Sequence, residues 1–190
     1  MLAKLNQSFQ QLANRRAFLV LLAAYCIYFP IFFFANVPFG ITAIRPYAAG
    51  AGILDVELFY TAEQAYERLA LFGEQGRAVY LHILMGDLIY PALLGSLLAV
   101  SISLIVRRIH LPNAAWQHVA LLPLANMVFD YCENAMLFSL LLSYPTRLPL
   151  VATAAGAFTF TKNVFGMLSF VVLACGVLAM LFRWFRPHHA

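Results

Sequence analysis

The chain has 190 residues, of which 63% are hydrophobic and only 11% are charged, and its formal net charge is +4. Soluble domains carry about 25% charged residues, and disordered chains are poor in apolar residues, so this composition excludes both classes. Three cysteines without a C-x-x-C pair also exclude a disulfide scaffold. The mean hydropathy of +0.81 indicates an integral membrane protein.

The length predicts the fold class. A spanning helix needs about 20 apolar residues, so this chain holds about four spans and no separate soluble domain. We therefore expect an all-α, four-helix transmembrane bundle that forms a single domain over residues 1–190. The first span is predicted at residues 17–35, after a polar N-terminal segment, and Pro30 is expected to kink it.

Residues 36–78 are predicted to form a long loop that contains a short amphipathic helix at 61–72. Thr61 and Gln64 fit a capping box at its start, and Gly73 fits the position just past its end. Its apolar face repeats at intervals of three and four residues and consists of Phe59, Ala62, Tyr66 and Leu69. Such a helix is expected to lie in the membrane interface or to cap the bundle.

The remaining spans are predicted at residues 79–106, 114–143 and 151–182. The two termini and the loop after the second span carry seven basic residues and no acidic one: Lys4, Arg15, Arg16, Arg107, Arg108, Arg183 and Arg186. The other loops mix both signs of charge. The positive-inside rule therefore places both termini in the cytoplasm and the long loop outside.

Four ionisable residues lie within the predicted spans: Asp87, Asp130, Glu133 and Lys162. A single charge at the centre of a lone helix costs at least about 2.5–3.5 kcal/mol, so such groups normally face the bundle interior and pair there. At about 1.5 Å per residue, all four lie roughly 12–20 Å below the outer boundary. We expect them to converge in one layer in the outer half of the membrane.

This layer is the candidate site. Asp130 and Glu133 are predicted to act as acid and base, and Asp87 and Lys162 are expected to tune them. Six further residues are predicted to bind a ligand: Asn126, Asn134, Thr159, Asn163, Tyr80 and Arg77. Of these, Asn126, Asn134 and Thr159 share helix faces with the four ionisable residues, and Arg77 is expected at the outer mouth. The sequence predicts no metal site and no cofactor. Membrane lipids and a small amphipathic ligand are the expected partners, and nucleic acid is not.

Four spans with cytoplasmic termini, a long first outer loop and acidic residues near prolines resemble the EXPERA group, which includes emopamil-binding sterol isomerases and the sigma-2 receptor. The segment Asp87-Leu-Ile-Tyr-Pro91 is the nearest local likeness. The resemblance covers layout, so it assigns no catalytic position. The segments GEQGRAVYL, DLIYP, FDYCEN and SYPTRLP are also similar to small bacterial membrane proteins, which favours the bacterial cytoplasmic membrane.

Three functions remain open from the sequence. The first is binding or acid/base conversion of a small amphipathic, lipid- or isoprenoid-like molecule, with isomerase- or cyclase-like chemistry if the protein is an enzyme. The second is proton- or ion-coupled transport by a homo-oligomer, although the inner halves of the second and fourth spans are nearly all apolar. The third is a structural or accessory subunit, for which the polar layer would be a dry network without a cavity.

Overall fold

The computed structural model of the protein describes residues 13–109 and 114–185, and the regular elements in these ranges are all helical. Lys4 and Arg186, which contribute to the predicted orientation, lie outside the described residues. The elements are α2 (Arg15–Phe34), η1 (Ile41–Tyr47), η2 (Leu54–Val56), α3 (Ala62–Asp87), α4 (Tyr90–Ile109), η3 (Ala114–Leu121), α5 (Leu122–Ser143) and α6 (Pro149–Phe185).

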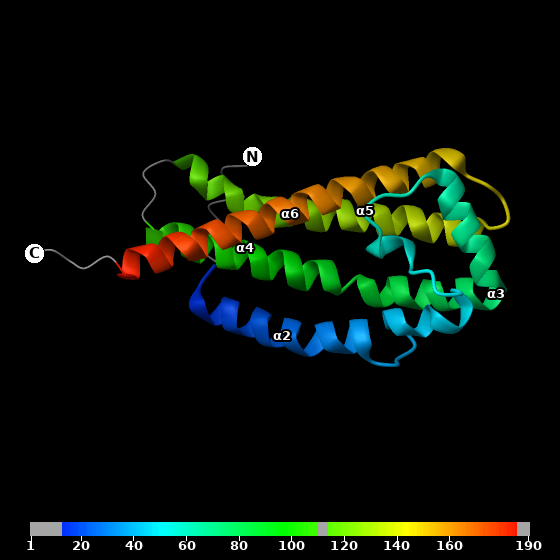
Figure 1. Ribbon diagram of the computed structural model, residues 1–190, viewed down its shortest axis with the longest axis horizontal. Helices are drawn as coiled ribbons and strands as arrows, with labels where there is room; N and C mark the ends of the chain where they lie inside the picture. Colours follow the sequence, from blue (N-terminus) through cyan, green and yellow to red (C-terminus); the bar gives the residue numbers. More distant parts are fainter. Residues whose placement is uncertain (1–12, 110–113, 186–190) are drawn as a thin grey trace, which may run out of the picture.

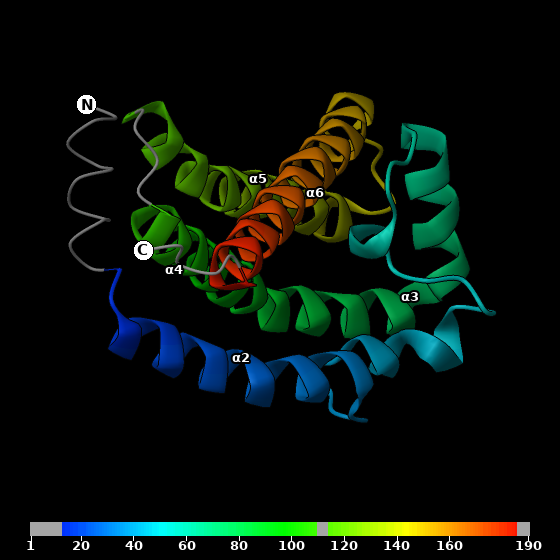
Figure 2. The ribbon, with the colours of Figure 1, turned by 60° about the vertical axis from the view of Figure 1, so that its left-hand side comes forward.

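The helices form a bundle in which α3 and α4 occupy the middle. Helix α2 lies on one side of them, and α5 and α6 lie on the other, as both ribbon views show (Figures 1 and 2). Helix α2 begins, and α4 and α6 end, at one end of the bundle, which we call the arginine end (Figure 1). Residues 36–60 lie toward the opposite end, which we call the loop end (Figure 1).

The first predicted span is confirmed as a helix. Asn14 caps it by accepting a hydrogen bond from the backbone N–H of Ala17 at 2.9 Å. Helix α2 runs through Pro30 and ends at Phe34, within two residues of the predicted bounds. The kink expected at Pro30 stays a prediction.

The amphipathic helix is also confirmed, as the first part of α3. Thr61 and Gln64 form the expected capping box, and Gly73 ends this part with φ +64°, a conformation that side chains other than glycine rarely adopt. Tyr66 and Leu69 are buried in the core, so the helix caps the bundle. Phe59 was expected on the same face, but it precedes the helix and its side chain is 55% exposed.

The predicted second span is not one uninterrupted helix. After Gly73, α3 continues to Asp87. Leu88 and Ile89 then form a turn, and α4 begins at Tyr90. Pro91 explains the break, because proline has no N–H to donate to the carbonyl of Asp87 four residues earlier. The helical segment therefore starts earlier than residue 79 and consists of two pieces.

The predicted third span is shorter than expected as an α-helix. Residues 114–121 form the 3-10 helix η3, and α5 begins only at Leu122, with Pro123 in its first turn. Helix α6 has 37 residues, which at about 1.5 Å each makes it longer than the hydrocarbon core is thick.

Three helical stretches of the described chain are long and apolar enough to cross a membrane: Arg15–Phe34, Ala62–Ile109 and Pro149–Phe185. These stretches support a membrane protein. Helix α5 is not among them, so the predicted bundle of four spanning helices is not confirmed.

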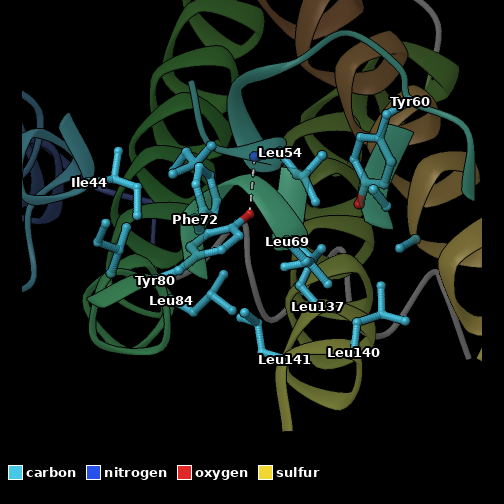
Figure 3. Packing of buried hydrophobic residues seen from close by; sticks show 14 of the residues in the cluster. Ile44, Leu54, Tyr60, Leu69, Phe72, Tyr80, Leu84, Leu137, Leu140 and Leu141 are labelled. Atoms are coloured by element: carbon cyan, nitrogen blue, oxygen red, sulfur yellow. Dashed lines mark hydrogen bonds between the residues drawn. The ribbon is translucent and has the colours of Figure 1, made fainter. Parts of the chain in front are cut away.

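The hydrophobic core lies toward the loop end, and part of the long loop belongs to it. Ile53 and Leu54 are almost fully buried in this core. Leu54 lies near Leu69, Tyr80 and the α5 leucines (Figure 3). The loop therefore folds back into the bundle, because residues 51–60 supply apolar side chains that cover α3 and α5.

Candidate functional site

The centre of the candidate site is an ion pair between α5 and α6. The Lys162 ammonium lies 2.8 Å from Oδ1 of Asp130 and 2.6 Å from Oε2 of Glu133. All three residues are buried, Glu133 completely and the other two to within 7%. Asp130 and Glu133 are three residues apart on α5 and so lie on one face, where the single ammonium can reach both.

Glu133 meets further donors on its other oxygen. The Thr159 hydroxyl lies 2.5 Å from Oε1, and the Tyr60 hydroxyl donates to the same atom at 3.3 Å. An ionised carboxylate accepts hydrogen bonds but cannot donate them. The surroundings of Glu133 therefore match its charged form, with Lys162 as counter-ion.

Asp87 belongs to the same polar layer through Asn134. The amide of Asn134 donates to Oδ2 of Asp87 at 2.8 Å, and both side chains are buried. Asn134 directly follows Glu133 on α5, so this bond joins the end of α3 to the helix that carries the ion pair. On the opposite side, the Asn126 amide donates to the backbone carbonyl of Lys162 at 2.7 Å and fixes α5 against α6.

The sequence interpretation missed two residues from the loop, Asp55 and Tyr60. The hydroxyl of Tyr80 donates to Oδ2 of Asp55 at 2.9 Å. The same hydroxyl accepts a hydrogen bond from the backbone N–H of Leu54 at 3.1 Å (Figure 3). Burial, reinforced by the negative charge of Glu133, raises the pKa of Asp55 from 3.8 to about 7. Asp55 stands between the apolar residues Leu54 and Val56, which was the available signal for its burial.

Tyr60 reaches Glu133 because its backbone lies directly on α6. A Cβ added to Gly156 would fall 2.0 Å from the Tyr60 carbonyl oxygen, far inside van der Waals contact. Glycine at this position therefore admits the loop. Burial and the nearby Glu133 charge raise the pKa of Tyr60 above its ordinary value, so its hydroxyl keeps its proton at neutral pH and acts as a donor.

The layer contains more acids than bases. Asp55 and Asp87 add two carboxyl groups to those of Asp130 and Glu133, and Lys162 supplies the ammonium. Buried charges are costly unless they are paired, so the layer is balanced only when protons or another cationic group compensate the excess. A group of this kind can exchange protons with a neighbour.

Two predicted ligand residues, Arg77 and Asn163, donate hydrogen bonds to backbone carbonyls outside the polar layer. Arg77 was expected at the mouth of the site, but its guanidinium donates to the Leu69 carbonyl at 3.0 Å and lies 3.9 Å from the centre of the Tyr144 ring. It therefore bridges the bend at Gly73. Asn163 donates to the backbone carbonyl of Glu57 at 3.0 Å, so it anchors the loop on α6.

A hollow of about 450 Å³ adjoins the network at the loop. Its lining includes Tyr60, Phe59, Leu71 and the acids Glu57 and Glu67, but none of the four residues predicted to be catalytic. Tyr60 is thus the residue that touches both the hollow and Glu133. Within residues 13–109 and 114–185, His, Cys, Asp and Glu side chains form no group of three that could hold a metal ion.

Comparison of the chain with protein-family models, with curated proteins and with solved structures finds no match. The resemblance to the EXPERA group therefore stays a prediction.

Proposed function

We propose that α5 is a fourth spanning helix and that both termini lie in the cytoplasm. Helix α5 carries the polar residues Asn126, Asp130, Glu133 and Asn134, and the last three are buried inside the bundle. The side chains that it exposes include Val128 and Leu142, which suit lipid. Its antiparallel position beside α6 brings the start of α2 and the end of α6 to the same end (Figure 1).

Reporter fusions test this topology. A fusion after Ala190 and an insertion within residues 50–60 should report opposite sides of the membrane, because an odd number of spans separates the two positions. Insertion after Pro145, in the α5–α6 connection, should report the same side as the loop insertion. If the Pro145 reporter lies opposite the loop reporter while the Ala190 reporter lies on the loop side, α5 does not span.

We infer that the protein binds a small amphipathic, lipid- or isoprenoid-like molecule in the hollow at the loop end, and that Glu133 exchanges a proton with it through Tyr60. The observation that carries this proposal is the double contact of Tyr60, which lines the hollow and donates to Glu133. The hollow combines the apolar side chains of Phe59 and Leu71 with the polar groups of Glu57, Glu67 and Arg68, and small-molecule sites combine an apolar lining with a few polar groups in this way.

The proposed chemistry follows from the hydroxyl of Tyr60. When a group in the hollow passes a proton to the Tyr60 oxygen, the hydroxyl proton moves to Oε1 of Glu133, and the reverse movement returns it. Thr159 and Lys162 hold the Glu133 carboxylate in position for this exchange. The proton transfer therefore needs no movement of the buried ion pair.

Mass spectrometry of lipid extracts from the purified protein tests the binding proposal. Leu71→Trp fills the hollow, and Leu150→Trp is the matched control, because Leu150 is exposed at the start of α6 and outside the hollow. We expect a small amphipathic molecule to co-purify with the wild type and with Leu150→Trp and to be depleted in Leu71→Trp. Identical extracts from all three proteins would contradict ligand binding and favour a structural network.

Tyr60→Phe separates binding from proton exchange. The substitution keeps the ring and removes the hydroxyl that donates to Glu133. We expect Tyr60→Phe to retain the co-purified molecule. The ratio of this molecule to its isomers or products in the extract should differ between Tyr60→Phe and the wild type. An unchanged ratio would restrict the function to binding.

A further inference from the structure

A second hollow lies at the arginine end, far from the polar layer. It has a volume of about 540 Å³ and runs between α4 and α6. Arg108, Arg183 and Trp184 contribute to its lining, the other five lining residues are apolar, and none is acidic. The Arg183 guanidinium donates to the carbonyl of Ile109, so α6 is tied to the end of α4 at this point.

The groove continues away from the arginines along apolar side chains. A neighbouring hollow of about 420 Å³ shares Ile105 and Val177 with the first one and extends past Leu173 to Phe18 and Leu22 of α2. From Arg183 to Leu173 the helix rises about 15 Å, at about 1.5 Å per residue. This distance is about half of a hydrocarbon core of about 30 Å, and thus the depth of one leaflet.

We propose that this groove binds an anionic phospholipid, with its phosphate at Arg108 and Arg183 and one acyl chain along Ile105, Val177 and Leu173. A guanidinium has five N–H donors, so the bond from Arg183 to Ile109 leaves donors for phosphate oxygens. Arginine binds phosphate through paired hydrogen bonds as well as through charge. Basic pockets between spanning helices bind anionic headgroups by the same chemistry.

Charge and position select this occupant. The apolar part of the groove lies within the spanning stretches of α4 and α6, so its ligand must be dissolved in the membrane. The two arginines, without an acidic residue in the lining, select a negative headgroup. Trp184 is exposed beside them and suits the membrane–water boundary.

Quenching of tryptophan fluorescence by brominated lipids tests the proposal. The chain has two tryptophans, so a Trp116→Phe background leaves Trp184 as the reporter. The full-length protein is placed in phosphatidylcholine nanodiscs with a minor fraction of phosphatidylglycerol, and either lipid carries bromine close to its glycerol. We expect brominated phosphatidylglycerol to quench Trp184 far more strongly than its share of the bilayer predicts.

Charge and shape variants distinguish a groove from general surface attraction. Each near-surface arginine contributes about fivefold to the attraction of an anionic lipid, so Arg108→Gln with Arg183→Gln should lower the preference for phosphatidylglycerol about thirtyfold. The control Arg45→Gln removes an exposed arginine from η1, outside the groove, and should leave the preference unchanged. Val177→Phe, which fills the junction of the two hollows without changing charge, should also lower it.

Two outcomes would overturn the proposal. If Val177→Phe keeps the wild-type preference, lipid is attracted only to surface charge and no acyl chain occupies the groove. If the wild type quenches equally with both brominated lipids, the groove does not select an anion. Circular dichroism of each variant confirms that it is folded, and Val177→Phe decides the question alone if the arginine variant is not.

Discussion

Lys162→Met is the most informative perturbation of the ion pair. It keeps an unbranched side chain of similar length in α6 but removes the ammonium that lies 2.8 Å from Asp130 and 2.6 Å from Glu133. Both carboxylates then remain in the bundle without their counter-ion. The side chains of the three residues are at most 11% exposed, so water cannot replace the lost partner without a change in packing.

The expected magnitude follows from this burial. Breaking a buried pair costs about 3–5 kcal/mol, whereas an exposed pair contributes about 0–1 kcal/mol. For a chain of this size, 1 kcal/mol corresponds to about 2–4 °C, so Tm should fall by about 6–20 °C. The assay is thermal unfolding in detergent near pH 8, followed by circular dichroism.

Two controls accompany this measurement. Thr161→Met changes a neighbouring residue of α6 that makes only a hydrogen bond to its own helix, and we expect a fall of less than about 1 kcal/mol. The triple variant with Lys162→Met, Asp130→Asn and Glu133→Gln removes all three charges and should recover most of the lost stability. If Lys162→Met matches the wild type, or the triple variant is no better than the single one, the account of the ion pair is wrong.

Two further predictions concern the loop. The fold raises the pKa of Asp55 to about 7, so folding favours its protonated form. The stability of the wild type relative to Asp55→Asn should therefore fall as pH rises from about 4 to about 7. A stability difference that is constant between those pH values would show that Asp55 is not buried beside Tyr80. Gly156→Ala should lower the free energy of unfolding, measured by chemical denaturation, by about 1–3 kcal/mol, because its Cβ collides with the Tyr60 carbonyl. The control Gly166→Ala, whose Cβ meets only the Asn126 amide at 3.3 Å, should lower it less. Equal losses would contradict the close approach of loop and helix.

The sequence predicts the ion pair because helix periodicity fixes which residues share a face. Asp130 and Glu133 are three positions apart, and Lys162 lies at a matching depth on the next helix, so burial in apolar spans requires them to meet. The same reasoning includes Asp87, although its observed partner is Asn134. The capping box of Thr61 and Gln64 and the helix end at Gly73 could also be predicted from the sequence, because both depend on neighbouring residues in the chain.

The path of the loop could not be predicted in the same way. No periodicity specifies that Asp55 enters the bundle or that Tyr60 packs on Gly156. These contacts join residues that are far apart in the sequence, and no repeating pattern links them. Arg77 was misplaced for a related reason. The bend at Gly73 turns it toward the Leu69 carbonyl and Tyr144, which are local to the loop end.

The breaks in the helices had weaker signals. Pro91 and Pro123 mark the start of α4 and α5, but both prolines stand inside long apolar runs that hydropathy alone joins into single spans. Hydropathy measures which segments avoid water and is blind to a missing N–H. The polar face of α5 has the opposite effect, because buried side chains lower the hydropathy of a helix whose exposed surface is apolar.

The break between α3 and α4 also makes this segment depend on the neighbouring helices. Two of its carbonyls accept hydrogen bonds from other helices: the Tyr28 hydroxyl of α2 donates to Gly86 at 2.6 Å, and the Tyr131 hydroxyl of α5 donates to Leu88 at 2.8 Å. The Gly86 carbonyl also accepts a hydrogen bond from the N–H of Ile89. Lipid offers no donor in place of the two hydroxyls. The α3–α4 segment alone would therefore leave the Leu88 carbonyl without its Tyr131 donor, so the packing of α5 beside this segment stabilises the break.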